Sequence, residues 1–275
     1  MAKRPSQESL SHHASFRFYA ELNDFLHPQR RGERFTHRYA GRVSVKDMIE
    51  SLGVPHTEVD LILVNGESVD FSRLVENGDI VSVYPVFEAI DISAVLRVRP
   101  EPLRTISFVV DVHLGGLARS LRMLGFDTHY ERDSSDEELA DLATRGRILL
   151  TKDRGLLKRN AVTHGYYVRS KDAMEQVLEV LRRFDLASHI NPFVRCLHCN
   201  GMLRPVAKET IEHRLEAQTN RYYEEFALCS ICDRVYWKGS HHAAMTRQVQ
   251  SIREKLQPKD GRNEERLPDN SHLGR

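Results

Sequence analysis

The four cysteines of this chain occur as two close pairs, Cys196-x-x-Cys199 and Cys229-x-x-Cys232, separated by residues 200–228. Two pairs at this spacing are typical of a zinc ribbon, in which four thiolates surround one tetrahedral zinc ion. Buried free cysteines and a redox dithiol are the alternatives, and two matched pairs argue against both. Because four thiolates leave no open coordination position, we expect a structural zinc ion.

Three aspartates stand where a parallel sheet would bring them together. Asp111 follows the apolar residues 106–110, and Asp153 follows the strand-like residues 148–151. Asp136 opens a segment whose apolar positions have helical spacing. The carboxyl ends of parallel strands meet at one edge of a sheet, so these carboxylates would share a cleft. Crowded carboxylates need a cation and select Mg²⁺ or Mn²⁺, and such an ion activates water for phosphodiester hydrolysis.

Each aspartate also has a purely structural interpretation. Asp136, followed by Glu137 and Glu138, is typical of a helix with a capped and acidic first turn. Asp153 fits equally well as the cap of a short helix after it. Asp111 precedes two consecutive glycines, which favours a close turn of the chain around a ligand. The spacing alone leaves the catalytic and the structural interpretations open.

Basic residues accompany these acids. Between residues 145 and 171, Asp153 is the only acidic residue among many basic ones. This contrast fits a polyanion-binding face or a solvated surface equally well. We expect Arg119 and Arg122 to flank the cleft, because leucines form the apolar stripe of their segment. The other candidate phosphate contacts are Lys152, Arg154, Lys158 and Arg159.

Aromatic and basic residues also follow the second cysteine pair. Trp237 and Lys238 could stack on RNA bases and neutralise phosphates. Alternatively, the aromatic side chain could merely cover a thin core.

The elements that position these residues fall into three units, preceded and followed by polar segments at residues 1–13 and 251–275 that we expect to be disordered. Residues 14–90 have the order strand, strand, helix, strand, strand, which is that of a β-grasp fold. The stretch LILVNGESVDFSRLVENGDIVSVYPVF resembles the ubiquitin-like sulfur carriers of thiamine and molybdopterin synthesis. Those carriers end in Gly-Gly, whereas Glu-Ala-Ile follows here. We therefore favour a docking module with a protein partner over sulfur transfer.

A linker is expected at residues 91–103, because two prolines there disfavour regular structure. Residues 104–188 alternate short apolar strands with amphipathic helices, which predicts a parallel α/β sheet flanked by helices. Residues 189–250 contain the cysteines and form the predicted zinc ribbon.

The segment FVVDVHLGGLARSLRMLGFDTHY, followed by SDEELADLA and GRILLTKDRGLLKR, resembles the PIN-like ribonucleases of the Mut-seven C-terminal RNase family. The resemblance covers about residues 106–185, and the flanking ubiquitin-like unit and zinc ribbon match architectures of that family. It implies metal-binding acids after the first strand, in D-x-x-L-x-x-x-A and in L-L-T-x-D, which are Asp111, Asp136 and Asp153. A fourth acid often completes such sites, and the candidates are Asp133, Glu137 and Asp172.

The resemblance implies a metal-dependent endoribonuclease that leaves a 3′-hydroxyl and a 5′-phosphate. We expect single-stranded or loop RNA as the substrate, with tRNA and rRNA as candidates. The alternative is a non-catalytic RNA-binding or ribosome-associated adaptor. No apolar run of about 18 residues occurs and the first residues are polar, so we expect no membrane association and a cytoplasmic location. The formal net charge of +1 adds nothing about partners.

Overall fold

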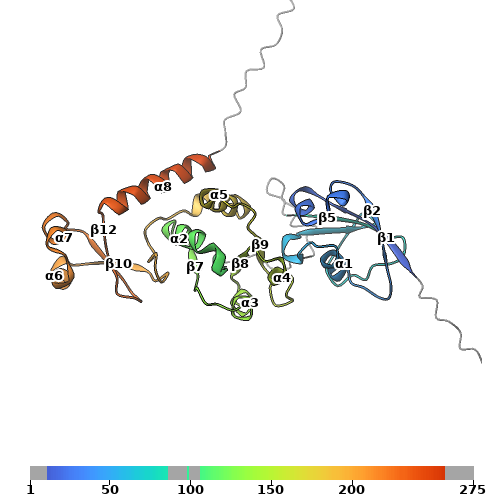
Figure 1. The fold of residues 1–275 in the computed structure, drawn as a ribbon, viewed down its shortest axis with the longest axis horizontal. Coiled ribbons are helices and arrows are strands. Elements are labelled where there is room, and N and C mark those ends of the chain that lie inside the picture. Colours follow the sequence, from blue (N-terminus) through green and yellow to red (C-terminus); the bar gives the residue numbers. More distant parts are fainter. Residues whose placement is uncertain (1–10, 86–97, 99–105, 258–275) are drawn as a thin grey trace, which may run out of the picture.

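A computed structural model describes residues 11–85, 98 and 106–257, which form three units in a row (Figure 1). The predicted linker at 91–103 lies outside the described residues except for Val98. Two predicted boundaries are wrong. Residues 12–13 belong to the first strand, and residues 251–256 continue the last helix, in which Ile252 is fully buried. None of the described helices is long and apolar enough to cross a bilayer.

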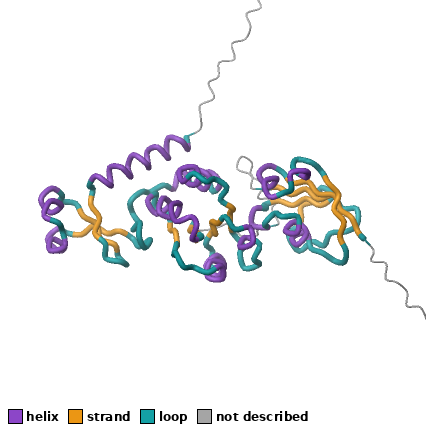
Figure 2. Tube along the Cα trace, in the orientation of Figure 1, coloured by secondary structure: helices purple, strands orange, loops and turns teal. Residues whose placement is uncertain are grey.

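The first unit confirms the β-grasp prediction. Its strands are the orange segments at the right of Figure 2. The sheet has the order β2-β1-β5-β3-β4, with β1 parallel to β5 and every other pair antiparallel. The strands are β1 (His12–Phe18), β2 (Phe35–Tyr39), β3 (Leu61–Val64), β4 (Glu67–Val69) and β5 (Ile80–Tyr84). Helix α1 (Val45–Ser51) begins after Ser44, whose hydroxyl accepts the N–H of Asp47. Short 3-10 turns occupy Ala20–Phe25, Pro28–Arg30 and His56–Glu58.

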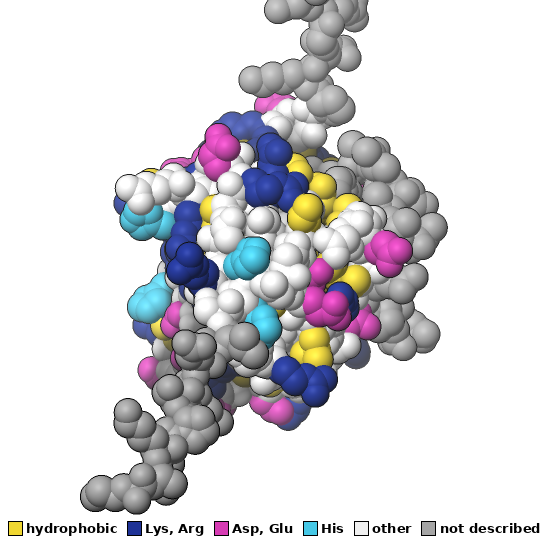
Figure 3. All heavy atoms as spheres, turned by 90° about the vertical axis from the view of Figure 1, so that its right-hand side faces the viewer, with side chains coloured by type: hydrophobic (Ala, Val, Ile, Leu, Met, Phe, Trp, Pro, Cys, Tyr) yellow, Lys and Arg dark blue, Asp and Glu magenta, His cyan; other side chains and the backbone are white. Residues whose placement is uncertain are grey.

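The apolar residues of the β-grasp unit form a core between its sheet and helix α1. Phe16, Ile49 and Val81 are fully buried between the sheet and the helix. At its outer end, apolar side chains form small separate patches among charged and histidine side chains (Figure 3).

The second unit is a four-stranded parallel sheet of order β7-β6-β8-β9, as the sequence predicted. Its strands are β6 (Ser107–Val110), β7 (Asp127–His129), β8 (Ile148–Thr151) and β9 (Gly165–Tyr167), and its helices are α2 (Gly115–Met123), α3 (Asp136–Thr144), α4 (Arg154–Leu157) and α5 (Ala173–Arg183). The side chains of β6 alternate between two cores: Phe108 packs with α2 and α5, and Val109 packs with α3 and α4. A 3-10 turn (Val112–Leu114) links β6 to α2.

The third unit is an antiparallel sheet of order β10-β11-β12. It comprises β10 (Leu203–Val206), β11 (Phe226–Cys229) and β12 (Val235–Trp237), with α6 (Lys208–Ile211) and α7 (Ala217–Tyr222) inserted between β10 and β11. Further 3-10 turns lie at Ala187–His189 and Glu212–Arg214. Helix α8 (Ser240–Leu256) returns to α5, where Val249 and Ile252 complete the core of the second unit (Figure 1). The second and third units therefore share a core.

Candidate functional site

The strand order places Asp111 and Asp153 at a topological switch point. From β6 the chain passes to β7, which pairs with one edge of β6, and it then passes to β8, which pairs with the other edge. The loops that leave the neighbouring strands β6 and β8 therefore run in opposite directions. Parallel α/β sheets bind ligands in the crevice that this divergence opens. Asp111 follows β6 and Asp153 lies two residues beyond β8, so both stand at that crevice.

The hydroxyl of Thr151 joins these two acids. It donates to Asp111 Oδ2 at 2.6 Å and accepts the backbone N–H of Asp153 at 2.9 Å. Thr151 is fully buried and Asp111 is only 6% exposed, so the hydrogen bond between them is shielded from water. The sequence analysis did not single out Thr151. The sequence feature that could have indicated its role is a single hydroxyl residue at the end of an otherwise apolar strand.

Asp153 also has the structural role considered for it. Its Oδ1 accepts the backbone N–H groups of Gly155 at 2.6 Å and Leu156 at 3.3 Å, which caps α4. Asp111 caps the turn after β6 through the N–H of His113 at 3.4 Å. Both carboxylates are thus held in place by the backbone.

Asp136 does not form a cluster with these two acids. It lies in the first turn of α3, which is capped by Ser135 and Glu138, and its Oδ2 lies 3.4 Å from Arg159 Nη2 at the surface. Among the described residues, the cysteines form the only group of three or more acids, histidines or cysteines with ligand atoms within 4.8 Å of one another. The expected three-carboxylate cluster is therefore not formed. Mg²⁺ often binds one or two carboxylates plus water, and the pair Asp111 and Asp153 fits that donor set.

The candidate fourth acids stay outside this pair. Asp172 caps α5 by accepting the N–H groups of Met174 at 2.9 Å and Glu175 at 3.0 Å. Asp133 and Glu137 are exposed on the chain around the start of α3.

Arg122 was placed wrongly by the sequence analysis. Its side chain is 4% exposed and donates to the carbonyls of Thr128, Tyr130 and His198 at 2.7–3.3 Å. The guanidinium thus ties α2 to the first cysteine knuckle and is not available to phosphates. Arg119, on the same helix, is exposed as expected.

Two of the candidate phosphate contacts, Lys158 and Arg154, lie against the β-grasp unit. Lys158 Nζ donates to Glu50 O at 2.7 Å, and burial lowers the pKa of Lys158. The guanidinium of Arg154 lies 5.0 Å from the ring centre of Phe25. Lys152 Nζ donates to Ser170 O at 2.6 Å. The ammonium groups of Lys158 and Lys152 thus have partners within the protein, whereas Arg154 is exposed. Phosphate binding by these three residues stays a prediction.

A buried ion pair anchors the same interface. Glu58, 1% exposed, accepts the N–H of Tyr167 at 2.5 Å and pairs with Arg169 at 3.0 Å. Burial raises the pKa of Glu58 although Arg169 opposes that change. His56 Nε2 lies 2.9 Å from Val162 O. The β-grasp unit thus docks on the edge of the sheet formed by β9 and on the loop after α4.

The four cysteine sulfurs lie together as the sequence predicted. Cys196 Sγ is 3.6 Å from Cys232 Sγ, and Cys199 Sγ is 3.4 Å from Cys229 Sγ. These separations are close to the edge of about 3.8 Å of a zinc tetrahedron with Zn–S bonds of about 2.3 Å. Burial raises the pKa of the Cys196 thiol, but hydrogen bonds from Tyr236 and from backbone N–H groups outweigh it, and the pKa falls to about 6. The set is compatible with a structural zinc ion.

Comparison with known proteins decides the family. The model described as the Mut7-C RNAse domain matches residues 106–249, more than half of the chain. The chain belongs to the Mut7-C RNase family. The model described as Mut7-C ubiquitin matches residues 11–91, in agreement with the β-grasp unit. The resemblance noted in the sequence is confirmed.

A human protein named exonuclease mut-7 homolog is 36% identical to this member of the Mut7-C family over 106 residues. The match covers 36% of this chain and 12% of the human protein, so the chain spans only a small part of that relative. No solved structure matches the chain.

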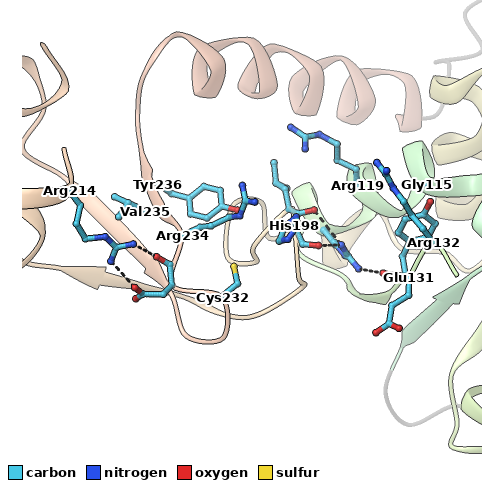
Figure 4. A pocket seen from close by; sticks show the side chains of 14 residues that line it. Gly115, Arg119, Glu131, Arg132, His198, Arg214, Cys232, Arg234, Val235 and Tyr236 are labelled. Atoms are coloured by element: carbon cyan, nitrogen blue, oxygen red, sulfur yellow. Dashed lines mark hydrogen bonds and ion pairs between the residues drawn. The ribbon is translucent and has the colours of Figure 1, made fainter. Parts of the chain in front are cut away.

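The Mut7-C RNase domain and its ribbon enclose a cavity of about 1110 Å³. Gly115, Arg119 and Tyr130 line it from the RNase side, and Arg234 and Tyr236 from the ribbon (Figure 4). The hydroxyl of Tyr130 donates to the carbonyl of Val112 at 3.1 Å, one residue beyond Asp111. The cavity therefore begins beside the turn that Asp111 opens.

Trp237 ends β12 of the ribbon, and Lys238 follows it. Trp237 is 40% exposed and borders a second cavity of about 570 Å³. Lys238 Nζ pairs with Glu225 at 2.6 Å, and this pair lies at the surface, where solvent competes with it.

Proposed function

We propose that this Mut7-C protein is a PIN-like, metal-dependent endoribonuclease. The observation that carries the proposal is the pair Asp111 and Asp153, joined by the hydroxyl of Thr151 at the switch point of an RNase-family sheet. Asp111 is buried and Asp153 is exposed, and backbone N–H groups hold both carboxylates at the crevice. They are what a hydrolytic site requires.

Asp111 and Asp153 would hold Mg²⁺ or Mn²⁺, which, when bound, lowers the pKa of water and stabilises a leaving oxygen. The protein's own contribution is to hold the two carboxylates in fixed positions. Thr151 directs Asp111 Oδ2 by a short hydrogen bond, and the start of α4 fixes Asp153 Oδ1. Asp136 keeps a place in the proposal as an exposed acid near the same edge, where it is balanced by Arg159.

We propose single-stranded or loop RNA as the substrate, with tRNA and rRNA as candidates and a 3′-hydroxyl and a 5′-phosphate as product ends. The human relative is named an exonuclease. Cleavage of a circular RNA separates the two modes, because an exonuclease requires a free end. We expect cleavage of the circle, and a requirement for a free end would overturn the endonuclease assignment.

The direct test replaces Asp111 by Asn, which keeps the shape and an acceptor for Thr151 but removes the charge. We expect the cleavage rate of labelled RNA with Mg²⁺ to fall by about 10³-fold or more. Asp141→Asn is the matched control, because Asp141 is an exposed acid on α3 that pairs with Arg145. Equal cleavage by wild type and Asp111→Asn would refute the proposal.

The alternative is a non-catalytic RNA-binding or ribosome-associated adaptor. It is favoured by one observation: the described residues do not gather three acids at one metal position. RNA binding by wild-type protein without any metal-dependent cleavage would establish this alternative.

Two further assignments belong to this proposal. The four cysteines would hold a structural zinc ion. The β-grasp unit would bind the RNase domain of the same chain before any other protein. The cytoplasmic location stays a prediction.

A further inference from the structure

Two adjoining cavities form one groove that runs from the RNase domain across the zinc ribbon. The first has a volume of about 1110 Å³ and the second about 570 Å³. They share the lining residues Arg119, Leu197, Val235 and Tyr236, so the two cavities meet at these residues. Its two ends differ in chemistry.

The end next to the RNase domain is basic. Arg119 on α2, Arg132 after β7 and Arg234 before β12 are exposed and line this cavity. In the part of the chain that the structure describes, none of the three guanidinium groups forms a hydrogen bond or an ion pair. Figure 4 shows Arg119 and Arg132 close to each other, with Arg234 across the cavity. Arg122 and Arg214 line the cavity too, but their guanidinium groups bond to carbonyls and to Asp233. Three arginines are therefore available to an anionic ligand.

The other end of the groove is aromatic. Tyr222 on α7 is 67% exposed and Trp237 on β12 is 40% exposed, and both line the second cavity with Tyr223 and His241. Exposed aromatic rings that line one cavity together mark an interaction site more often than a single exposed ring does. Aromatic faces beside a basic groove are the usual platform for unpaired bases.

We propose that this groove binds single-stranded RNA, with Arg119, Arg132 and Arg234 holding phosphates and Tyr222 and Trp237 stacking on bases. The inference rests on the proposed function, because the RNase domain makes RNA the expected polyanion. A duplex is excluded as the ligand, since its bases are stacked on each other and not on protein. The basic end lies beside Tyr130, which bonds to the residue after Asp111, so the strand leads toward the acids.

The sequence supplies a direct probe of this groove. Trp237 is the only tryptophan of the chain, so its fluorescence reports on the aromatic end. We would titrate full-length Asp153→Asn protein, which does not cleave under the proposal, with single-stranded RNA of about 12 nucleotides. We expect quenching that saturates together with binding measured by fluorescence anisotropy. Binding without any change in Trp237 fluorescence would contradict the aromatic assignment.

Substitutions test the basic end and the aromatic end of the groove separately. Replacing the three arginines by Ala should reduce the slope of log affinity against log salt by about 2, because each phosphate contact on a single strand contributes about 0.7. Tyr222→Ala should weaken binding about 5- to 100-fold. Arg247→Ala is the control, since Arg247 is an exposed arginine of α8 outside both cavities. Trp237→Phe should restore most of the affinity that Trp237→Ala loses.

The outcomes distinguish failure of the groove proposal from failure of the proposed nuclease activity. Unchanged salt dependence in the triple arginine variant, or equal affinity for duplex and single strand, would overturn the groove proposal even if the protein cleaves RNA. If the groove substitutions weaken RNA binding but wild-type protein does not cleave RNA, the groove proposal is supported and the proposed nuclease activity is refuted.

Discussion

Thr151→Val tests whether the two acids work as a linked pair. Valine has nearly the shape of threonine but no hydroxyl, so Asp111 Oδ2 loses its donor at 2.6 Å and the Asp153 N–H loses its acceptor at 2.9 Å. A hydrogen bond to a charged group contributes about 1.5–3 kcal/mol, and an amide left without a partner costs about 1–3 kcal/mol. The added methyl group offsets part of this loss. We therefore expect the free energy of unfolding to decrease by about 2–4 kcal/mol.

The effect on cleavage should exceed the effect on folding. A released Asp111 carboxylate can rotate away from the crevice, and a misplacement of about 1 Å in a catalytic group costs up to about 100-fold in rate. Urea unfolding gives the stability, and the initial rate against RNA concentration at saturating Mg²⁺ gives kcat and KM. We expect kcat to fall about 10- to 100-fold with KM nearly unchanged.

Thr151→Ser is the control for this experiment, because serine keeps the hydroxyl and loses only a methyl group. It should recover most of the cleavage rate even where stability is reduced. If folded Thr151→Val protein cleaves RNA at the wild-type rate, the hydroxyl does not position the acids and the two-acid site would have to be abandoned.

Three further predictions concern the surrounding structure. Cys229→Ser should lower the zinc content from about one ion per chain to near zero and destabilise the ribbon, as elemental analysis and thermal unfolding would show; a native protein without zinc would contradict the site. In Glu58→Gln, the acceptor for Tyr167 remains but the charge facing Arg169 is lost. Since burial raises the pKa of Glu58, its contribution to stability is present at low pH and lost as the pH rises. The stability advantage of wild type over the variant should therefore shrink as the pH rises above the ordinary range of a glutamate, and an advantage that grows would contradict this sign. A protein beginning at residue 104 should still cleave RNA, more slowly than the full chain, because the acids lie outside the β-grasp unit; an inactive but folded truncation would show that this unit contributes to the site.

The sequence predicted those features that depend on local spacing. The two Cys-x-x-Cys pairs fold as compact knuckles, so their meeting could be anticipated. Asp111 and Asp153 were placed correctly at strand ends, because alternation of apolar strands and helices determines a parallel sheet. Asp136 was placed correctly at the start of a helix, but its side chain lies at the surface beside Arg159 and does not join the other two acids.

Contacts between distant segments were not predictable from spacing. Arg122 resembles a surface residue of an amphipathic helix, yet its carbonyl partners include His198 in a knuckle far along the chain. The strip of basic residues around Asp153 resembles a polyanion site, yet Lys158 bonds to the helix of the β-grasp unit. Helix α8 is mostly polar, and only Val249 and Ile252 are buried, which is too weak a pattern to distinguish its end from a disordered tail.

These unpredicted contacts change the expected role of the β-grasp unit. Helix α4, which Asp153 caps, has only four residues, and so short a helix is not stable without packing around it. Lys158 at its end donates to Glu50, and Asn160 just beyond accepts from Lys46 at 2.7 Å, so α1 holds the far end of the element whose near end carries the acid. A ubiquitin-like module expected to recruit a partner therefore also supports the sheet edge at which we propose RNA cleavage. A partner that pulled this module away would loosen α4, and with it the position of Asp153.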